Sequence, residues 1–382
     1  MNPFSFQVPQ EIHFGEKSIQ KLPELLKKED PKKILLISDR GLEKAGTVQK
    51  ILDVLEQSGI ERETYLDVLP NPTVKIVDEV TALYRTSGAD CIIALGGGSP
   101  MDVAKAVGIL ARYGGSITGY EGAEKVPGPI VPIVAVPTTA GTGSEVTAFS
   151  VITDTEHNYK LSVFSYKIIP KYAVLDPELI YSLPQAVAAS TGIDAMIHAL
   201  EAYVSRGASP FSDAMAEKAL ELIGANIRPF TACRQDKEAA CAMLTGSMFA
   251  GIAFAWARLG NVHAMSHPVS AFYGVAHGVA NSVLLPAVLE YNALADRGRY
   301  EIIYNYIKKS SGPSENFVPR ILVEEIYELL DDFGIPRKLS DLGVEKEVVP
   351  RMAADAMKSG NILANPRQTT QKDIEQLYYS LL

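Results

Sequence analysis

The sequence predicts an α/β domain built on a parallel sheet, followed by an all-α domain. Its 382 residues exceed the size at which one hydrophobic core stops growing, so two domains are expected. In the first half, short apolar runs alternate with segments of helical periodicity, the order of a parallel sheet that is covered on both faces. In the second half only the helical periodicity continues. We therefore expect an α/β domain over 1–183 and a helical domain over 184–382.

The predicted strands of the first domain are short apolar runs that end at turn residues. They span 33–38, 63–68, 91–95 and 131–136. Between consecutive strands, apolar residues recur every three or four positions, which predicts helices with one buried face at 42–59, 74–88 and 101–115. A further apolar run, 146–154, predicts a strand at the edge of the sheet or in a hairpin.

The second domain is predicted to consist of long helices. The clearest helical patterns cover 211–227, 237–260, 315–334 and 369–382. Ser212 or Asp213 is a candidate N-cap for the first of these helices, and Thr369 or Thr370 for the last. Their side-chain oxygens can accept hydrogen bonds from the free amides of a first helical turn.

Composition and charge narrow the classes of protein to which the chain can belong. No apolar run is as long as a membrane span, and the N-terminus lacks the basic start and apolar core of a signal peptide. The formal charge of −9 disfavours nucleic acid and anionic membranes as partners. The cysteines, Cys91, Cys233 and Cys241, lack CxxC spacing, which fits a reducing compartment. We therefore expect a cytoplasmic protein with neither nucleic acid nor a membrane as partner.

A glycine-rich loop follows the strand at 91–95 and opens the next helix. Gly97 and Gly98 would let the backbone approach a pyrophosphate closely, and the helix N-terminus would favour its negative charge. Ser99 adds a hydroxyl group, and Asp102 is a candidate to bind a ribose hydroxyl or to cap the helix. The loop differs from the usual G-x-G-x-x-G fingerprint, so a tight strand-to-helix turn is the alternative explanation of its glycines.

A second loop with small hydroxyl side chains follows the strand at 131–136. It carries Thr138, Thr139 and Thr142 among glycines. Like the first loop, it is expected at the carboxyl end of a parallel strand, where such sheets bind ligands. An ordinary Ser/Thr turn is the alternative interpretation. Together the two loops favour a Rossmann-like domain that binds a dinucleotide.

Asp39, at the end of the first predicted strand, bears on the choice of dinucleotide. Its carboxylate can accept a hydrogen bond from the adenosine ribose 2′-hydroxyl and would repel a 2′-phosphate, so NAD is favoured over NADP. Arg40 beside it would partly cancel that repulsion. Asp39 is also a candidate cap for the helix that starts at Gly41, and the two roles are compatible.

Two short clusters of side chains in the second domain are typical of a metal site. Asp194 and His198 are four residues apart on a predicted helix, so both lie on one face. His263 and His277 stand in a segment that is helical, breaks near Gly274 and resumes. One carboxylate and three imidazoles suit Fe(II) or Zn(II) and leave open positions for a substrate oxygen. The alternative is that each histidine is a buried, hydrogen-bonded core residue.

Taken together, these motifs resemble those of the iron-containing alcohol dehydrogenases, often called group III. The resemblance extends over essentially the whole chain, including Asn71-Pro72 and Asn365-Pro366-Arg367. It depends on GGGSxxDxAK (96–105), PTTAGTGSE (137–145), TGxDAxxHAxE (191–201) and GxxHAxxHxxxxxxxxxHGxxN (260–281).

The resemblance implies roles for individual residues. It implies that Fe(II) is bound by Asp194, His198, His263 and His277, with His267 near the nicotinamide and outside the ligand set. It also implies an NAD site lined by Asp39, Asn71, Gly97, Gly98, Ser99, Thr138, Thr139, Thr142, Lys160 and Val187. Trp256 and Asn361 depart from the commoner family pattern, which leaves the identity of the substrate open.

The sequence thus predicts an NAD- and Fe(II)-dependent enzyme that transfers a hydride between nicotinamide and a small primary alcohol, diol or aldehyde. His267 is a candidate to relay the proton of the alcohol to solvent, and a packing role is its alternative. A homodimer or larger homo-oligomer is expected. Two other interpretations stay open, namely a zinc-dependent relative of the glycerol dehydrogenases or dehydroquinate synthases and a non-catalytic NAD-binding subunit.

Overall fold

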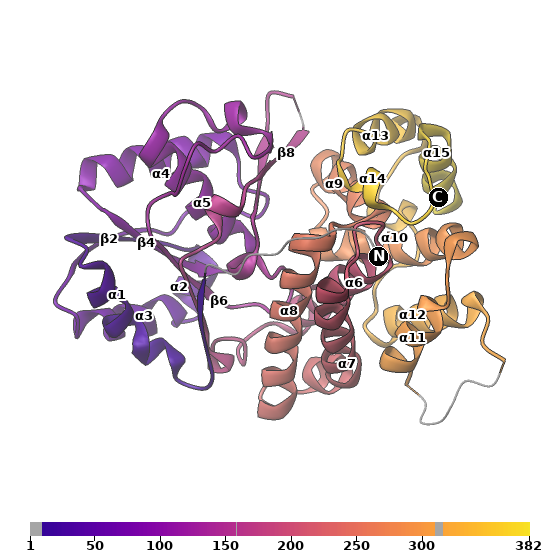
Figure 1. The fold of residues 1–382 in the computed structure, drawn as a ribbon, viewed down its shortest axis with the longest axis horizontal. Helices are drawn as coiled ribbons and strands as arrows, with labels where there is room; N and C mark the ends of the chain where they lie inside the picture. Colours follow the sequence, from indigo (N-terminus) through magenta and orange to yellow (C-terminus); the bar gives the residue numbers. More distant parts are fainter. Residues whose placement is uncertain (1–9, 158, 310–315) are drawn as a thin grey trace. The chain divides into compact units, whose positions relative to one another are not determined.

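The computed structural model of the protein describes residues 10–157, 159–309 and 316–382. The chain divides into two compact units between Leu183 and Pro184. The first unit is α/β and the second is helical, which confirms the predicted fold class (Figure 1).

A six-stranded sheet in the order β1-β9-β6-β4-β2-β3 forms the centre of the α/β unit. Every neighbouring pair of strands in it is parallel, as predicted. The strands are β1 Glu11–Phe14, β2 Lys33–Ile37, β3 Glu61–Tyr65, β4 Cys91–Gly96, β6 Ile133–Pro137 and β9 Tyr172–Leu175.

Alternate residues of the central strands face opposite layers of helices. Leu35 and Ile37 of β2 belong to the apolar cluster that α4 and α5 contribute to, whereas Ile34 and Leu36 belong to the cluster of α1 and α3. Figure 1 shows these two pairs of helices on opposite sides of the sheet. The helices of this unit are α1 Leu22–Glu29, α2 Arg40–Lys44, α3 Thr47–Glu56, α4 Val74–Ser87 and α5 Gly98–Tyr113.

The run predicted at 146–154 forms a hairpin outside the main sheet. Its strand β7, Phe149–Asp154, pairs antiparallel with β8, Tyr159–Phe164. The short strand β5, Gly122–Ala123, pairs with β8 to complete a three-stranded sheet. The hairpin was one of the two arrangements that the sequence predicted for this segment.

Two features of the α/β unit differ from the sequence prediction. The helix expected over 42–59 is divided into α2 and α3, because Gly46 adopts a left-handed conformation with φ of 77°. The edge strand β1 and its neighbour β9 were not predicted. Each has only four residues, and β1 mixes charged and apolar side chains.

The helical unit contains the long helices that the sequence predicts and several shorter ones. They are α6 Gln185–Val204, α7 Pro210–Ala232, α8 Lys237–Ala257, α9 Asn261–Tyr273, α10 His277–Asn292, α11 Arg299–Ile307, α12 Pro319–Asp332, α13 Val349–Ala356, α14 Asn361–Ala364 and α15 Gln371–Ser380. Short 3₁₀ helices also occur in both units, at Ser18–Lys21, Ile117–Tyr120, Ser144–Val146, Tyr166–Ile168, Pro177–Leu179, Ala293–Ala295, Ser340–Leu342 and Lys346–Val348.

One of the two predicted helix caps is right and the other is wrong. Thr370 caps α15, accepting a hydrogen bond from the backbone N–H of Asp373, as expected. The cap of α7 is Ser209, and Ser212 instead returns a bond to the Ser209 backbone as the third residue of a capping box. The prediction placed this cap at Ser212 or Asp213 because it overlooked Pro210, a residue that favours the first helical position.

Helix α8 is long and apolar enough to cross a membrane, which corrects the expectation that no segment would be. Its most apolar window is 67% buried inside the structure. Burial of this extent is typical of a helix in the core of a folded domain, so length and composition alone are weak evidence of a membrane span.

Candidate active site

Three side chains of the helical unit converge on one point. They are Asp194 on α6, His263 on α9 and His277, the first residue of α10. One ligand-type atom from each lies within 4.8 Å of the other two. His263 Nε2 is 3.7 Å from Asp194 Oδ1, and His277 Nε2 is 4.0 Å from the same oxygen. The side chains of Asp194 and His263 are almost fully buried, and His277 is 29% exposed.

His198, the fourth predicted ligand, lies beside this group. Its ring stacks on that of His263, with a centroid separation of 4.5 Å and an interplanar angle of 22°. Its ring also stacks on Phe254 at 4.5 Å. The converging group of the described residues does not include His198. The role of His198 as a ligand therefore stays a prediction, although its ring stacks directly on that of His263.

The amide of Asn281 lies among the three converging atoms. Its Nδ2 donates to Asp194 Oδ1 at 2.7 Å and is 3.1 Å from Nε2 of both His263 and His277. When both imidazoles are neutral with Nε2 as acceptor, three electron-pair donors surround this one point, namely Asp194 Oδ1 and the two Nε2 atoms. A divalent cation satisfies all three at once. The donor set therefore fits a metal ion such as Fe(II) or Zn(II).

The electrostatics of the group also favour a positive charge at this point. Burial opposes the charged form of His263, but the nearby carboxylate of Asp194 and the hydrogen bond to Glu201 raise its pKa to about 9. Burial by itself would raise the pKa of Asp194, whereas the positive charges of His198, His263 and His277 lower it below its ordinary value. The ionised carboxylate of Asp194 thus attracts a cation to this point.

Glycine at position 278 allows α10 to approach α6 closely beside Asp194. A Cβ atom there would lie 2.5 Å from the carbonyl oxygen of Ser190 and 3.5 Å from Cβ of Asp194. The backbone of α10 would have to move away from α6, and His277 would move with it, because it is the adjacent residue.

We expect Gly278→Ala to lower the free energy of unfolding by about 1–3 kcal/mol and to weaken metal binding at the same time. Thermal unfolding and metal titration measure the two effects. Gly360→Ala is the matched control, because a Cβ at Gly360 would meet no atom within 4 Å. If Gly278→Ala binds the metal with wild-type affinity, the close contact between α10 and α6 is not needed to position His277.

His267 lies on the same helix as His263, one turn further along. Its ring centroid is 5.5 Å from that of His277, with an interplanar angle of 32°. It lies outside the converging group. The structure therefore brings His267 next to a predicted ligand, and its role in proton transfer remains a prediction.

The two predicted cofactor loops of the α/β unit are packed together. A Cβ on Gly97 would lie 3.3 Å from Thr139 Oγ1, and one on Gly98 would lie 3.1 Å from Thr142 Cγ2. The backbone N–H of Thr138 donates to the carbonyl of Gly96 at 3.0 Å. No side chain caps the N-terminus of α5. The arrangement suits an anionic group, which amides at an uncapped helix start can bind.

Asp102 holds the second loop in place, and it does not cap α5. Its carboxylate accepts from Ser144 Oγ at 3.0 Å and from the backbone N–H of Val151 at 3.2 Å. The buried ammonium of Lys105 donates to the same Ser144 hydroxyl at 3.0 Å. The N-cap residue of α5 is Gly97, which corrects the capping interpretation. Binding of a ribose by Asp102 stays a prediction.

Asp39 caps α2, one of the two roles expected of it. Its Oδ1 accepts from the backbone N–H of Leu42 at 3.0 Å. The guanidinium of Arg40 donates to Asp67 at 2.8 Å and to Glu43 at 3.0 Å. Asp67 and Glu43 neutralise much of the positive charge of Arg40. Arg40 therefore offsets the negative charge of Asp39 less than the sequence suggests.

The remaining predicted cofactor residues occupy several segments. Lys160 of β8 donates to Asn71 Oδ1 at 2.8 Å, and Asn71 has a left-handed backbone with φ of 55°. Ser99 lies in the first turn of α5 and is partly buried. Val187 lies in the first turn of α6 in the helical unit, and its side chain is 37% exposed.

Sequence reasoning missed two residues that contact the converging group. Asn281 follows His277 by one helical turn, and Glu201 follows His198 by three residues. Glu201 Oε2 lies 2.7 Å from His263 Nδ1. Both residues stand inside the quoted motifs, and their helical spacing from predicted ligands was the available signal.

The comparisons with known proteins assign the chain to a family. The family model described as "Iron-containing alcohol dehydrogenase" matches residues 9–177, and the one described as "Fe-containing alcohol dehydrogenase family, C-terminal" matches residues 188–382. The chain therefore belongs to the iron-containing alcohol dehydrogenase family and is an oxidoreductase, as its motifs predict.

The similarity to individual relatives extends over nearly the full length of each. The 1,3-propanediol dehydrogenase of Citrobacter freundii is 39% identical over 98% of both chains, and the lactaldehyde reductase of Escherichia coli K12 is 39% identical over 96% of both. A crystal structure of a 1,3-propanediol oxidoreductase superimposes with a TM-score of 0.95 at 39% identity and covers both chains fully. The sulfoacetaldehyde reductase of Bifidobacterium kashiwanohense, solved in complex with NAD⁺, gives a TM-score of 0.88 at 29% identity, over 100% of this chain and 99% of that one.

Proposed function

We propose that the protein is an NAD- and Fe(II)-dependent alcohol dehydrogenase or aldehyde reductase. It transfers a hydride between nicotinamide and a small primary alcohol, diol or aldehyde. The observation that carries the proposal is the convergence of Asp194, His263 and His277 in a chain of this family. The NAD⁺ complex of a related reductase and the packed glycine and threonine loops support the choice of cofactor.

The two units have separate roles in this proposal. The helical unit, 184–382, holds the metal through Asp194, His198, His263 and His277. The α/β unit, 1–183, supplies most of the NAD site, in which the amides at the start of α5 bind the pyrophosphate. The NAD-binding residues are Asp39, Asn71, Gly97, Gly98, Ser99, Asp102, Thr138, Thr139, Thr142 and Lys160, with Val187 from the helical unit. The enzyme acts in the cytoplasm as a homo-oligomer.

A bound divalent cation supplies a Lewis acid that favours the alkoxide form of an alcohol and polarises the carbonyl of an aldehyde. Asp194 and three neutral imidazoles leave the site with a net charge of about +1, enough to stabilise an alkoxide. Burial of Asp194 and His263 keeps water away from the ligand atoms and strengthens their electrostatic interactions. His267 passes the proton of the alcohol toward solvent.

We expect His267→Gln to change the pH dependence of turnover and to leave metal content near one ion per chain. An amide cannot gain and lose a proton near neutral pH, so the relay step would be lost while the metal ligands stay intact. Steady-state rates from pH 6 to pH 10 and elemental analysis measure the two effects. Loss of metal with an unchanged pH profile would make His267 a ligand.

We expect Asp39→Gly to raise the preference for NADP over NAD by about tenfold, the effect of removing roughly 1.4 kcal/mol of repulsion. Glycine at an N-cap costs only a few tenths of a kcal/mol relative to Asp, so stability should change little. Asp39→Asn is the matched variant, because it keeps the acceptor for Leu42 and removes only the charge. Ratios of kcat/KM for the two cofactors test the role, and unchanged ratios in both variants would refute it.

The proposal is tested by reconstituting the metal-free protein without oxygen, using Fe(II) or Zn(II) in separate samples. Oxidation of NADH by short aldehydes is then followed by absorbance. Fe(II)-dependent turnover supports the proposal, and turnover with Zn(II) alone favours the zinc-dependent alternative. Metal and NADH binding without turnover on any aldehyde or alcohol would favour a non-catalytic subunit.

A further inference from the structure

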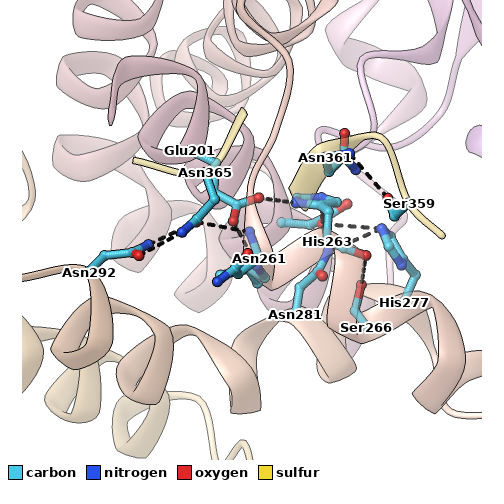
Figure 2. Close-up of polar contacts among 12 residues, drawn as sticks. Glu201, Asn261, His263, Ser266, His277, Asn281, Asn292, Ser359, Asn361 and Asn365 are labelled. Carbon is cyan, nitrogen blue, oxygen red and sulfur yellow. Dashed lines mark hydrogen bonds and ion pairs between the residues drawn. The ribbon is translucent and has the colours of Figure 1, made fainter. Parts of the chain in front are cut away.

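A buried carboxylate beside the converging group has no place among the predicted ligands. Glu201 lies near the end of α6 and is 3% exposed. Its Oε2 is 2.7 Å from His263 Nδ1, and its Oε1 accepts from the backbone N–H of Val262 at 2.8 Å. Figure 2 shows Glu201 facing His263, with both carboxylate oxygens engaged. The Glu201 side chain thus binds both the ring of His263 and the backbone N–H of the preceding residue, Val262.

These two contacts determine which nitrogen of His263 can bind a cation. An ionised carboxylate only accepts hydrogen bonds, so the atom that faces Glu201 must be a protonated Nδ1. In the neutral ring Nε2 then carries the lone pair, and Nε2 is the atom that points toward Asp194 Oδ1. A hydrogen bond from the second ring nitrogen commonly fixes the tautomer and orientation of a metal-binding histidine.

Glu201 also fixes the helix on which His263 stands. Helix α9 begins after Gly260, which has no side chain to cap the first amides. Side chains from other elements supply these caps, since Asn365 Oδ1 accepts from Asn261 N–H at 3.2 Å and Glu201 accepts from Val262 N–H. A Cβ at Gly260 would lie 2.9 Å from both Asn365 Oδ1 and Glu201 Oε1, so the close approach requires glycine there.

Asn365 is itself held firmly by a second amide. It exchanges two hydrogen bonds with Asn292 of α10, at 2.8 and 3.0 Å, and its Nδ2 also donates to the carbonyl of Arg367 at 2.7 Å. All three of Asn261, Asn292 and Asn365 are buried. Figure 2 shows Asn261 and Asn365 near Glu201, and Asn292 hydrogen-bonded to Asn365 on the side away from Glu201. Asn365 and Glu201 therefore both accept hydrogen bonds from the first amides of α9. Of these two side chains, Glu201 is the one that also contacts a candidate ligand, His263.

We propose that Glu201 is a positioning residue that sets the tautomer and orientation of His263 and thereby the affinity of the site for a divalent cation. The inference rests on the proposed function, because it takes His263 as a ligand. Glu201 touches neither substrate nor cofactor in this account. It acts only through His263 and the first turn of α9.

The test is Glu201→Gln, which keeps the size of the side chain. If the amide oxygen accepts from Val262, the NH₂ group faces His263 Nδ1 and drives the ring proton onto Nε2, where it blocks the metal. If the oxygen accepts from His263 instead, the NH₂ group faces the N–H of Val262, and a buried donor is left unpaired. Either arrangement weakens binding, and we expect the dissociation constant for Zn²⁺ to rise about 10–100-fold.

Glu325→Gln is the matched control. Glu325 is also a buried carboxylate of the helical unit, and it accepts from a backbone amide, that of Lys309, and from Arg228 at 3.0 Å each. Within the part of the chain that the structure describes, Glu325 makes no hydrogen bond to a predicted metal ligand. Chelator competition with Zn²⁺ should therefore give the wild-type affinity for Glu325→Gln, even where thermal stability falls.

Histidine ¹⁵N NMR of the wild-type protein loaded with Zn²⁺ is a second measurement, and it does not depend on the variant folding. It should find the proton of His263 on Nδ1 and the metal on Nε2. Wild-type Zn²⁺ affinity in folded Glu201→Gln, or a proton on Nε2 of His263, would overturn the inference while the proposed function stands. A wild-type protein that binds no metal would overturn the proposed function, and this inference with it.

Discussion

His263→Ala should lose metal and turnover together. Replacing even a residue that supports a metal ligand typically costs 10–100-fold in affinity, so removal of a ligand should weaken binding by more than about 100-fold. The loss should be large here because His263 is buried and lies 3.7 Å from Asp194 Oδ1. Alanine would leave the carboxylate of Asp194 buried without that partner. Elemental analysis after anaerobic reconstitution with Fe(II), followed by a rate measurement, gives both quantities.

The chain offers a stringent control for this experiment. Asp154, Glu156 and His157 also bring three ligand-type atoms within 4.8 Å of one another, but Glu156 and His157 are exposed. Exposed acidic groups bind cations weakly because water competes for the charge. His157→Ala should therefore retain metal and activity. An active, metal-loaded His263→Ala protein, or a metal-free His157→Ala protein, would show that the metal is bound elsewhere.

Metal uptake should depend steeply on pH. Burial opposes a charge on His263, yet the nearby carboxylate of Asp194 and the hydrogen bond to Glu201 raise its pKa to about 9 in the metal-free protein. A cation can bind Nε2 only after that proton leaves, so the apparent affinity should rise about tenfold for each pH unit below 9. The increase between pH 7 and pH 9 is then roughly 100-fold, and it should level off above pH 9. Competition with a chelator whose own protonation is known measures the slope.

The same shift predicts how the stability of the metal-free protein changes with pH. The pKa of His263 is raised above the ordinary value of 6.5, so its proton stabilises the fold fully below about pH 6.5. That contribution should disappear as the pH rises through about 9. In the metal-loaded protein the metal replaces this proton on Nε2, so this loss of stability should not occur. A metal affinity that does not change between pH 7 and pH 9 would contradict the raised pKa.

The fold could be predicted from the sequence wherever local pattern and tertiary structure agree. The strands predicted at 33–38 and 91–95 contain the continuous apolar runs 34–37 and 91–95, and the structure has β2 and β4 there. Strands β1 and β9 were missed because four residues carry little pattern and because their pairing is not local: β1 pairs with β9 across about 160 residues of sequence, and β9 also pairs with β6. The cap of α7 was misplaced because Ser212 and Asp213 are also good capping residues, although Pro210, which favours the first helical position, indicates Ser209.

The sequence predicted the candidate metal ligands, but it did not predict the side chains that hydrogen-bond to them. Asp194 with His198 and His263 with His277 form short clusters of metal-binding residue types, a signal that sequence alone provides. Glu201 and Asn281 meet the group only because α6 packs against the starts of α9 and α10. Helical spacing places Glu201 near His198 and Asn281 near His277, but Glu201 is 62 residues from His263 and Asn281 is 87 from Asp194, so local spacing does not reveal these two contacts. The two caps of α9 depend in the same way on the folded chain.

An anomalous difference map at the iron edge, from crystals grown without oxygen in the presence of Fe(II), tests the account most directly. We expect a single strong peak about 2.1 Å from Asp194 Oδ1 and from Nε2 of both His263 and His277, with His198 as the fourth ligand. A map with no peak among these atoms, or with its peak at Asp154 and His157, would contradict the account.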